Sequence, residues 1–281
     1  SREILQEHHL VDTIKKAVTK RMLDSLKDFK KDSFDSYKEF WNEYGLVLKE
    51  GPAEDRENKD LIASLLLFSS TYANSKDSDQ SLDDYLERMS DDQDKIYYCV
   101  ADTYEAAANS PHIEGLKSKG IEVLLLTDRI DEWVMAGLME YQGKELVNVA
   151  KEDVVDEDKT KKVSEADQDT LAKIKKQLDD KVSDVIISKR LTDSASCIVL
   201  PKHEPGAQLR KILEASGQSL GSSNPIFEIN MKHKLVKKLK DMKGKQFNSF
   251  VDFLYDYAVI AEGGSPQDPS KYLRQLDKYL S

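Results

Sequence analysis

Histidine and cysteine are the side chains of this sequence that can perform the widest range of chemistry, because they ligate metals and act as bases or nucleophiles. The five histidines do not have the HExxH or Cys2His2 spacing of zinc sites, so we expect no metal site. These histidines are His8, His9, His112, His203 and His233. Cys99 and Cys197 lie in apolar runs, which favours buried thiols of a reducing compartment over a redox-active role.

Phosphate and acyl chemistry lack motifs in the required setting. The GxSxG match GQSLG at 217–221 follows an expected helix instead of joining a strand to a helix, and the sequence has no Walker motif and no GxGxxG. The turn after Cys99, VADTYEAAAN, contains no glycine, so its backbone is not expected to approach a phosphate closely. We therefore expect neither a nucleotide site nor a hydrolase centre within the chain.

One basic run stands out from an acidic chain. It is interleaved with Leu235, Val236, Leu239 and Met242, which share one helical face. Its lysines are Lys232, Lys234, Lys237, Lys238, Lys240, Lys243 and Lys245. A core-docked helix with a solvated lysine face is the main interpretation, and binding of an anionic partner is the alternative.

Composition limits the classes of protein further. The chain has 281 residues, 39% hydrophobic and 33% charged, with a net charge of −10. The length suggests two folded domains, and the negative charge argues against a general nucleic-acid binder. No apolar run approaches the ~18 residues of a membrane span, so a soluble protein is expected.

The first third of the chain is predicted to be helical. Apolar residues recur every three or four positions from Val11 to Phe29, which indicates one long amphipathic helix with a buried stripe. Shorter helices are expected over 34–41 and 61–66, with Gly51-Pro52 breaking the chain between them. Ser81 and Asp84 resemble a capping box that opens a helix over 82–89.

The next segment has the pattern of an αβα unit. Strands are expected over 95–101 and 121–126, joined by helices over 104–108 and 111–119, as in a parallel crossover connection. Asp128 is expected to cap a further helix that extends through Glu140. A third, edge strand is predicted over 145–149.

A charged segment over 151–180 predicts a solvated connector and helix rather than a core segment. After it, strands over 182–188 and 195–200 are expected to pair around the Thr192-Asp193 turn. A helix over 208–215, a strand over 225–229 and two closing helices complete the chain.

The first closing helix is apolar on two faces. Phe247, Val251, Leu254 and Ala258 form one stripe, and Phe250, Phe253 and Tyr257 form a second. A helix with two apolar faces needs two partners, which predicts a homodimer formed through a four-helix bundle. The alternative is that both stripes pack inside one chain.

Several longer stretches resemble one known family in their order and spacing. They are SREILQ at 1–6, FWNEYGLVLKEGPAED at 40–55, SLDDYLERM at 81–89, IYY at 96–98, NSPHIE at 109–114, GIEVLLLTDRIDEW at 120–133, SKRLTDS at 188–194, IFEIN at 226–230 and VIAEGG at 259–264. Together they resemble the heat-shock protein 90 molecular chaperone family, in particular its bacterial HtpG type. The resemblance covers essentially the whole chain.

The resemblance implies an α+β fold in three parts. Residues 1–150 would be the C-terminal part of a middle domain, with a helical segment over 1–90 and a small αβα unit over 91–150. Residues 151–180 would be a charged connector and helix. Residues 181–281 would be an α+β dimerisation domain that ends in a helical hairpin.

The resemblance also implies site residues. Arg2 and Gln6 would act on ATP bound in an N-terminal domain that this sequence lacks, since a guanidinium suits a transferring phosphoryl group. The client-binding residues would be Glu132, Trp133, Met135, Leu209, Ile212 and Leu213, with Ala136 standing where a polar residue is usual. The dimer interface would contain Phe250, Leu254, Tyr257, Leu273, Leu276 and Leu280.

The function implied is that of a fragment of an ATP-dependent chaperone that binds unfolded clients and forms a homodimer. The fragment itself would not be an enzyme and would carry no cofactor, whereas the full-length protein would be a slow ATPase that uses ATP and Mg. No nucleic acid or membrane partner is expected, and a bacterial cytoplasmic location fits. The alternative is a non-catalytic helical scaffold or adaptor that binds folded partners.

Overall fold

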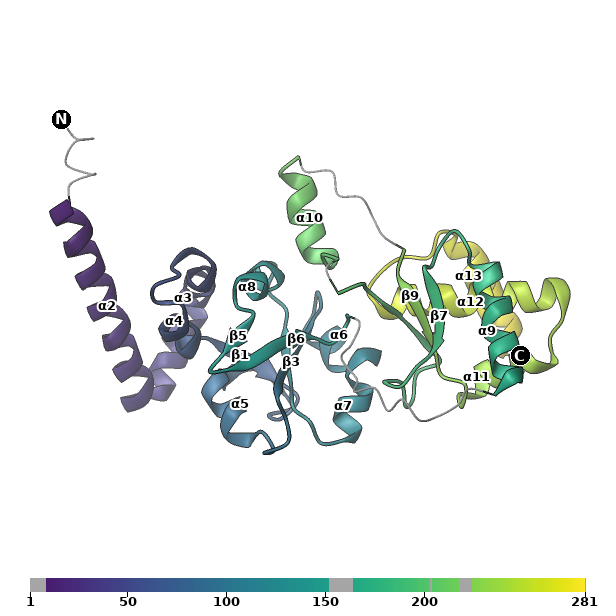
Figure 1. The fold of residues 1–281 in the computed structure, drawn as a ribbon, viewed down its shortest axis with the longest axis horizontal. Coiled ribbons are helices and arrows are strands. Elements are labelled where there is room, and N and C mark those ends of the chain that lie inside the picture. Colours follow the sequence, from purple (N-terminus) through teal and green to yellow (C-terminus); the bar gives the residue numbers. More distant parts are fainter. Residues whose placement is uncertain (1–8, 152–163, 203, 218–223, 281) are drawn as a thin grey trace. The chain divides into compact units, whose positions relative to one another are not determined.

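The computed structural model describes residues 9–151, 164–202, 204–217 and 224–280. The helices, shown in Figure 1, are α2 (His9–Asp32), α3 (Phe34–Glu54), α4 (Lys59–Leu65), α5 (Leu82–Arg88), α6 (Tyr104–Ala108), α7 (Glu114–Ser118), α8 (Asp131–Gly137), α9 (Glu165–Gln177), α10 (Ala207–Ala215), α11 (Lys234–Lys237), α12 (Gly244–Ala261) and α13 (Pro269–Leu280). Two 3-10 helices are η1 (Pro111–Ile113) and η2 (Lys238–Asp241).

The strands form two sheets and give the chain its α+β character. They are β1 (Leu67–Ser70), β2 (Ser75–Ser81), β3 (Lys95–Val100), β4 (Val123–Leu126), β5 (Glu140–Tyr141), β6 (Lys144–Asn148), β7 (Asp184–Ile187), β8 (Ser196–Val199) and β9 (Ile226–Ile229). One sheet has the order β2-β1-β4-β3-β6-β5, and the other has the order β7-β9-β8. The predicted strand over 145–149 is therefore an inner strand, and β5 forms the edge.

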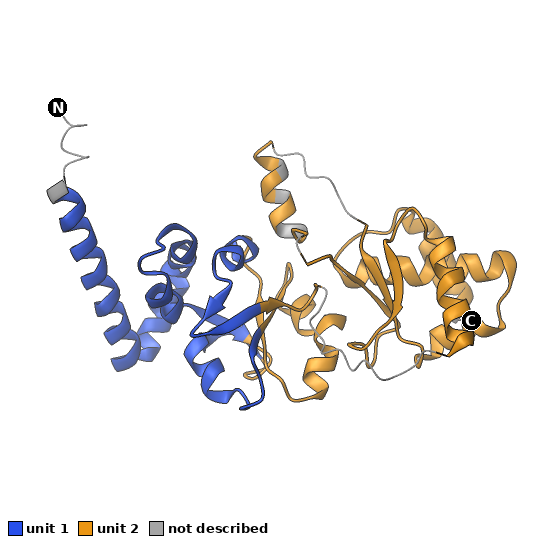
Figure 2. Cartoon of the chain, viewed as in Figure 1, with its two compact units in different colours: residues 1–69, 75–96, 130–146 blue, residues 70–74, 97–129, 147–281 orange. Residues whose placement is uncertain are grey.

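The chain divides into two compact units that do not follow chain order (Figure 2). Unit 1 contains residues 1–69, 75–96 and 130–146, and unit 2 contains residues 70–74, 97–129 and 147–281. The segment 97–129 thus shares a unit with the C-terminal part of the chain. The domain limits expected from the sequence stay a prediction.

In unit 1, α3 continues through the predicted break at Gly51-Pro52. Proline in a helix removes one hydrogen bond and crowds the preceding turn, and Pro52 lies in the last turn of α3, which ends two residues later at Glu54. Gly51 is required for packing, since a methyl group there would lie 2.8 Å from the side chain of Ile62 on α4. The expected chain break is therefore wrong, and the contact between α3 and α4 explains the glycine.

The long helix α2 forms where the periodicity predicts it, but its apolar stripe is not buried. Val11, Ile14, Val18 and Met22 are all exposed, and Met22 retains 61% of its surface. Only the end of the helix is covered, where Leu23 is buried. The expectation of a continuous buried stripe is wrong within the described residues, because periodicity specifies a face but not its cover.

The middle of unit 1 confirms one local signal and corrects another. Ser81 and Asp84 form both hydrogen bonds of a capping box at the start of α5. Helix α8 ends at Gly137 and has Ile130, with no side-chain cap, before its first residue. The predicted capping by Asp128 and the extension to Glu140 are wrong, because Gln142 and Gly143, both at positive φ, turn β5 back onto β6.

In unit 2, the predicted crossover is confirmed. Strands β3 and β4 pair in parallel, with Tyr98 opposite Leu124. Thr103 caps α6 by accepting a hydrogen bond from the backbone of Ala106. Ser110 caps η1, and Gly120 follows α7 at a φ of +71°, as glycine commonly does after a helix.

The strands over 182–188 and 195–200 are present, but they do not pair with each other. Strand β9 lies between them, parallel to β7 and antiparallel to β8. Phe227 of β9 consequently faces Val185 on one side and Ile198 on the other. The predicted hairpin is wrong because the buried residues of β9 complete a core that neither neighbouring strand could cover alone.

A buried polar cluster fastens the αβα segment to the small sheet within unit 2. The guanidinium of Arg190 donates to Glu228 at 3.2 Å and to the carbonyl of Val149 at 2.5 Å. Glu114 accepts hydrogen bonds from the backbone of Thr192 and Asp193 at 2.7 and 2.9 Å. Three of the sequence stretches that carry the family resemblance therefore meet at one place.

The core of the C-terminal part is formed by α9, the small sheet and α12. Ile174 and Leu178, at the end of the segment expected to lack a core, are at most 1% exposed and belong to this cluster. Both apolar stripes of α12 also contribute, from Phe247 to Ala258. Packing inside one chain, the alternative reading of these stripes, thus accounts for most of them, although Tyr257 is only partly buried.

Candidate functional site

The region that best fits peptide binding is built around the short helix α8. Its buried residues include Asp131, Val134 and Met135, whereas Trp133 is half-buried and Ala136 is exposed. Residues three apart on a helix share a face, so Trp133 and Ala136 face outward together. The outward face of α8 therefore carries one aromatic side chain, Trp133, beside the small side chain of Ala136.

Close packing against α3 sets the position of α8. A methyl group at Gly137 would lie 3.0 Å from Cα of Ala53, so glycine lets the two backbones approach. At the other end of α8, the ammonium of Lys49 lies 2.6 Å from the carboxylate of Asp131. Lys49 is 4% exposed and Asp131 is fully buried.

This buried ion pair fixes the register of the first turn of α8. Removing one partner of such a pair leaves an uncompensated charge, which typically costs about 3–5 kcal/mol. The same ammonium lies 5.4 Å from the centre of the Phe68 ring, within the range of a cation–π contact. Lys49 thus connects α3, β1 and α8 at one point behind Trp133.

A groove of about 700 Å³ opens in front of Trp133. It is lined by Pro52, Ala53, Arg56, Glu57, Lys59, Asp60, Trp133, Ala136, Gly137 and Met139. Met139 is 67% exposed, and thioether and indole groups adapt to many apolar shapes. The groove therefore combines an adaptable apolar wall with a rim of both charges.

The charged rim belongs to the loop between α3 and α4, which local hydrogen bonds hold in shape. The Asn58 amide side chain donates to Asp55 at 2.7 Å, and the Asn58 backbone donates to the same carboxylate at 3.1 Å. These bonds lower the pKa of Asp55, chiefly through the Asn58 side chain. Beside them, Glu57 pairs with Lys16 of α2 at 2.6 Å.

Two of the residues predicted to bind clients at α8 do not reach the surface. Glu132 is 6% exposed and Met135 is 3% exposed. Met135 lies two positions after Trp133, a rotation of roughly 200° around a helix, so its side chain points into the protein. The prediction is corrected here: Met139, which follows the helix, supplies the exposed methionine.

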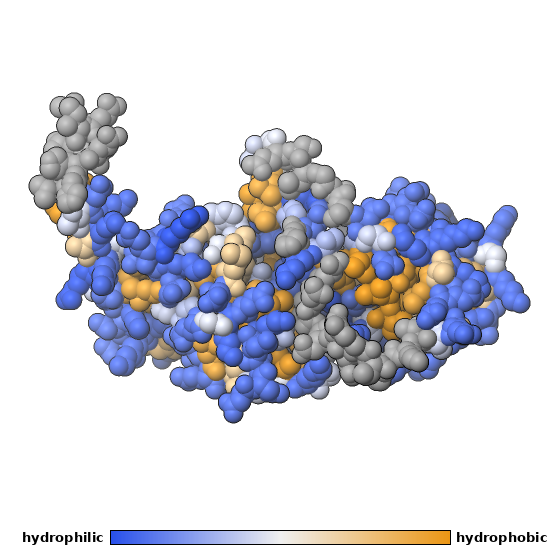
Figure 3. Space-filling model, in the orientation of Figure 1, coloured by the Kyte–Doolittle hydropathy of each residue, from blue (hydrophilic) through white to orange (hydrophobic). Residues whose placement is uncertain are grey.

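The other predicted client residues lie on α10, in unit 2. Leu209 and Leu213 are half-buried, and Ile212 is 39% exposed. Figure 3 shows apolar side chains gathered on this helix. An ion pair between Glu204 and Arg210 holds the start of α10, so the helix carries an accessible apolar face of its own.

The residues predicted to form a dimer interface differ in their exposure. Phe250 and Leu254 are buried by contacts within one chain, and the Phe250 ring packs edge-on against Tyr279 with centroids 4.6 Å apart. Tyr257 and Leu276 are half-buried, and Leu273 is 59% exposed. The side chain of Leu280 lies outside the described residues. Leu273, Leu276 and Tyr257 thus keep part of their apolar surface accessible.

The turn before α6 does not have the features of a phosphate-binding loop. The N-terminus of α6 is already capped by Thr103, and the turn before it has no glycine, so the residues do not fit a phosphate. No group of three or more metal-ligating side chains gathers within the described ranges. Arg2 and Gln6 lie outside those ranges, so their predicted roles are not tested.

Sequence reasoning missed the residues of the α3–α4 loop. Pro52, Arg56 and Lys59 face Trp133 although they lie more than seventy positions earlier in the sequence. Only the stretch from 40 to 55, already part of the family resemblance, signalled that this loop is special. Strand β2, which has the polar sequence SKDSDQS, also lacks the apolar alternation that would reveal it.

Comparisons with known proteins agree with this architecture. The family model described as Hsp90 protein matches residues 1–281. Chaperone protein HtpG from Legionella pneumophila (strain Lens) is 43% identical over 286 residues, which cover 100% of this chain and 46% of the relative. Chaperone protein HtpG from Pseudoalteromonas translucida is 43% identical over 289 residues, with 45% of its length covered. The chain thus spans about half the length of these relatives.

Proposed function

Because the chain belongs to the Hsp90 protein family, we propose that it binds unfolded segments of client proteins in the groove beside Trp133. The observation that carries the proposal is the arrangement of a half-buried Trp133 and an exposed Met139 around an open groove. Unfolded chains expose large apolar side chains in no fixed geometry, and adaptable apolar surfaces suit them.

The charged rim supports the same proposal. Client segments contain charged residues beside apolar ones, and Arg56, Lys59 and Asp60 can meet either sign at the edge of the groove. Contacts at an exposed rim are weak and tolerant, whereas the apolar wall supplies most of the binding free energy. Such a site would accept many sequences, as a general chaperone requires.

Helix α10 is proposed as a second client-contacting element. Its exposed Ile212 and half-buried Leu209 and Leu213 form an apolar strip that no described residue covers completely. An amphipathic helix can offer this strip to an extended client segment. The proposal treats α10 and the α8 groove as separate contacts, each with modest affinity.

Two further parts of the proposal follow from family membership. We propose that α12 and α13 mediate homodimer formation, with Leu273, Leu276 and Tyr257 in the contact. We also propose that ATP is bound by a part of the family architecture outside this chain, with Arg2 and Gln6 reaching it. No helix of the described residues has the length and apolarity needed to cross a membrane.

The experiment that tests client binding compares aggregation of a denatured model protein, such as citrate synthase, with and without the chain. We expect the chain to suppress light scattering, and Trp133→Ala to weaken suppression several-fold, because the largest apolar group of the groove is lost. Tyr44→Ala is the matched control, since Tyr44 is 56% exposed on α3 but does not line the groove.

Each outcome of this experiment decides between the two candidate functions. Suppression that depends on Trp133 but not on Tyr44 supports client binding at the groove. A chain that suppresses no aggregation would instead fit the scaffold or adaptor interpretation. Equal losses in both variants would move the binding site away from Trp133, and circular dichroism of each variant confirms that it is folded.

A further inference from the structure

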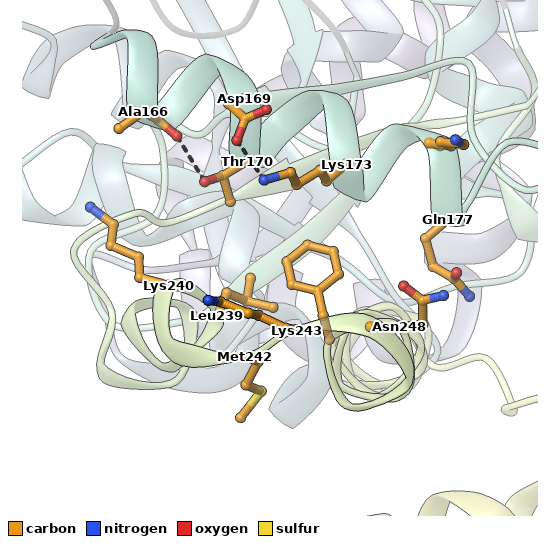
Figure 4. A pocket seen from close by; sticks show the side chains of 13 residues that line it. Ala166, Asp169, Thr170, Lys173, Gln177, Leu239, Lys240, Met242, Lys243 and Asn248 are labelled. Carbon is orange, nitrogen blue, oxygen red and sulfur yellow. Dashed lines mark hydrogen bonds and ion pairs between the residues drawn. The ribbon is translucent and has the colours of Figure 1, made fainter.

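A second groove lies in unit 2, between α9 and the segment formed by η2 and the start of α12. It has a volume of about 740 Å³. Figure 4 shows α9 along one wall and the η2–α12 segment along the other. All of its lining residues belong to one compact unit.

The groove has an apolar floor. Leu239 is 2% exposed, Phe247 is 9% exposed and Met242 is half-buried. Phe247 and Leu239 belong to the core cluster beneath the groove, so the floor is rigid. A side chain that enters from outside would therefore meet a preformed apolar surface.

The walls of the groove are strongly basic. Four lysines and one aspartate line it, namely Lys173, Lys176, Lys240, Lys243 and Asp169. Lys173 pairs with Asp169 at 2.6 Å, and Lys240 lies 3.4 Å from Asp167. Among the described residues, Lys176 and Lys243 have no ion-pair partner. The groove thus keeps uncompensated positive charge in a chain whose net charge is −10.

The start of α12 adds to this charge. Lys243 occupies the N-cap position and makes no side-chain cap hydrogen bond, and the first turn contains no acidic residue. Helix N-termini carry a partial positive charge and unsatisfied N–H groups, which ordinarily attract an acidic cap. Lysine is the opposite of the usual choice, so the sequence places positive charge where helix stability favours negative charge.

From these features we propose that the α9–α12 groove binds an acidic peptide segment that carries a large apolar side chain. The lysines occupy both walls rather than converging on one point (Figure 4), which suits several carboxylates along a chain better than a single phosphate. The apolar floor receives the side chain between them. A local groove also suits a segment, because the negative charge of the whole chain repels a large acidic protein.

This site is independent of client binding at Trp133. Its lining residues belong to unit 2, whereas the Trp133 groove belongs to unit 1. The α8 groove has a rim of both charges and would accept many sequences. The α9–α12 groove would select acidic segments, so the two sites differ in the chemistry they recognise.

The test uses a short fluorescein-labelled peptide of Asp, Glu, Phe and Leu, and measures fluorescence anisotropy with the whole chain. We expect binding that weakens as salt is added, because exposed charges are screened. The same peptide with Asn and Gln in place of the acids, or with Ser in place of Phe and Leu, should bind at least about tenfold more weakly.

A pair of charge-reversed variants locates the site. Lys176→Glu with Lys243→Glu should weaken binding by about tenfold or more, since attraction to the acidic side chains is lost and replaced by repulsion. The matched control is Lys232→Glu with Lys237→Glu, which makes the same change in net charge at exposed lysines outside the groove. The preference for the acidic peptide over its amide counterpart should be the same in Trp133→Ala, because the Trp133 groove has a rim of both charges.

Three results would overturn the proposal. The first is equal affinity for the acidic peptide and its amide counterpart. The second is an equal loss in the groove variant and the control variant, which would reveal a general charge effect. The third is equally tight binding of a single-stranded RNA oligonucleotide in the groove, which would make the site one for polyanions in general rather than for peptides.

Discussion

Helices α2 and α12 are both long and both amphipathic, yet the apolar face of α2 is exposed and that of α12 is buried. On α2, Val11, Ile14, Val18 and Met22 remain exposed. On α12, Phe247, Phe250, Val251 and Leu254 are all buried, although two apolar stripes had to be covered. Amphipathic periodicity therefore specifies that a helix has an apolar face, whereas burial depends on which other elements reach it.

The difference lies in what surrounds each helix. Helix α12 contacts α9, β8 and α13. From α13, the Tyr272 ring stacks on Phe253 of α12, and the Tyr279 ring packs against Phe253 at a tilt. Helix α2 contacts α3 and α4, and those contacts lie toward its C-terminal end, where Lys30 donates to the carbonyl of Ser64 at 2.5 Å. Helix α12 is buried because other elements contact it on several sides, whereas α2 is contacted mainly toward one end.

The largest effect is expected for Phe250→Ala on α12. Phe250 is fully buried against Phe253 and Tyr279, so its loss should lower the free energy of unfolding by about 3–5 kcal/mol. Hydrogen exchange of the α12 amides measures this change without assuming that both units unfold together. Tyr44→Ala, at an exposed aromatic residue, is the control. A loss below ~1 kcal/mol would contradict the burial described here.

Leu273→Asp tests the exposed apolar surface of the pair formed by α12 and α13. Leu273 is 59% exposed in one chain, so we expect little change in folding but weaker self-association by about 1.5–3 kcal/mol. Sedimentation velocity measures the change, with Ser270→Asp as the control of equal charge. An unchanged dimer would place the interface elsewhere. Removing α13 is a poorer test, because it also uncovers Phe250 and Phe253.

The next prediction concerns the stability cost of a buried carboxylate on α12. Asp256 is 7% exposed. Burial raises its pKa, Asp252 and Asp268 add to the increase, and Lys181 and Lys271 oppose it. The pKa of Asp256 is then higher in the folded chain than in the unfolded chain. The contribution of this carboxyl group to stability therefore falls as the pH rises from its unfolded pKa through its folded pKa. Asp256→Asn should therefore modestly stabilise the chain at pH 7.

The same substitution should have a smaller effect at pH 4, where the carboxyl group is more protonated in the folded state. Urea unfolding at both pH values measures this difference, with Asp277→Asn on the exposed side of α13 as the control. A larger stabilisation at pH 4 than at pH 7 would contradict the direction of the pKa change.

The smallest effect is expected for Met22→Ala on α2. Met22 is 61% exposed, and substitutions at such positions change stability by about 0.5 kcal/mol or less. Thermal unfolding measures this change, and binding of an apolar dye to α2 should fall at the same time. A cost near 2 kcal/mol would show that another part of the chain covers the stripe in solution.

The local signals of the sequence predicted much of the fold. The capping box at Ser81 and Asp84 and the parallel pair β3 and β4 appear where they were expected. Each depends on residues close in sequence, or on the short right-handed connection between two apolar strands. The family resemblance likewise came from ordered local motifs, and the comparisons confirm it.

The candidate site could be predicted only in part. The DEW stretch indicated Trp133, but the sequence could not show that Met135 points inward and Met139 outward, because it does not reveal which face of α8 other elements cover. The opposite wall of the groove comes from the α3–α4 loop. Contacts across such a separation leave no periodic pattern in a single sequence.

The sequence by itself determined most of the helical and strand segments, the capping box of α5 and the family. The tertiary structure decided that β9 separates β7 from β8, that Lys49 reaches Asp131, and that α12 is covered whereas the stripe of α2 is not. The physical reason is that hydrogen bonding within an element is a local property. The burial of a face depends instead on apolar area contributed by segments far away in the chain.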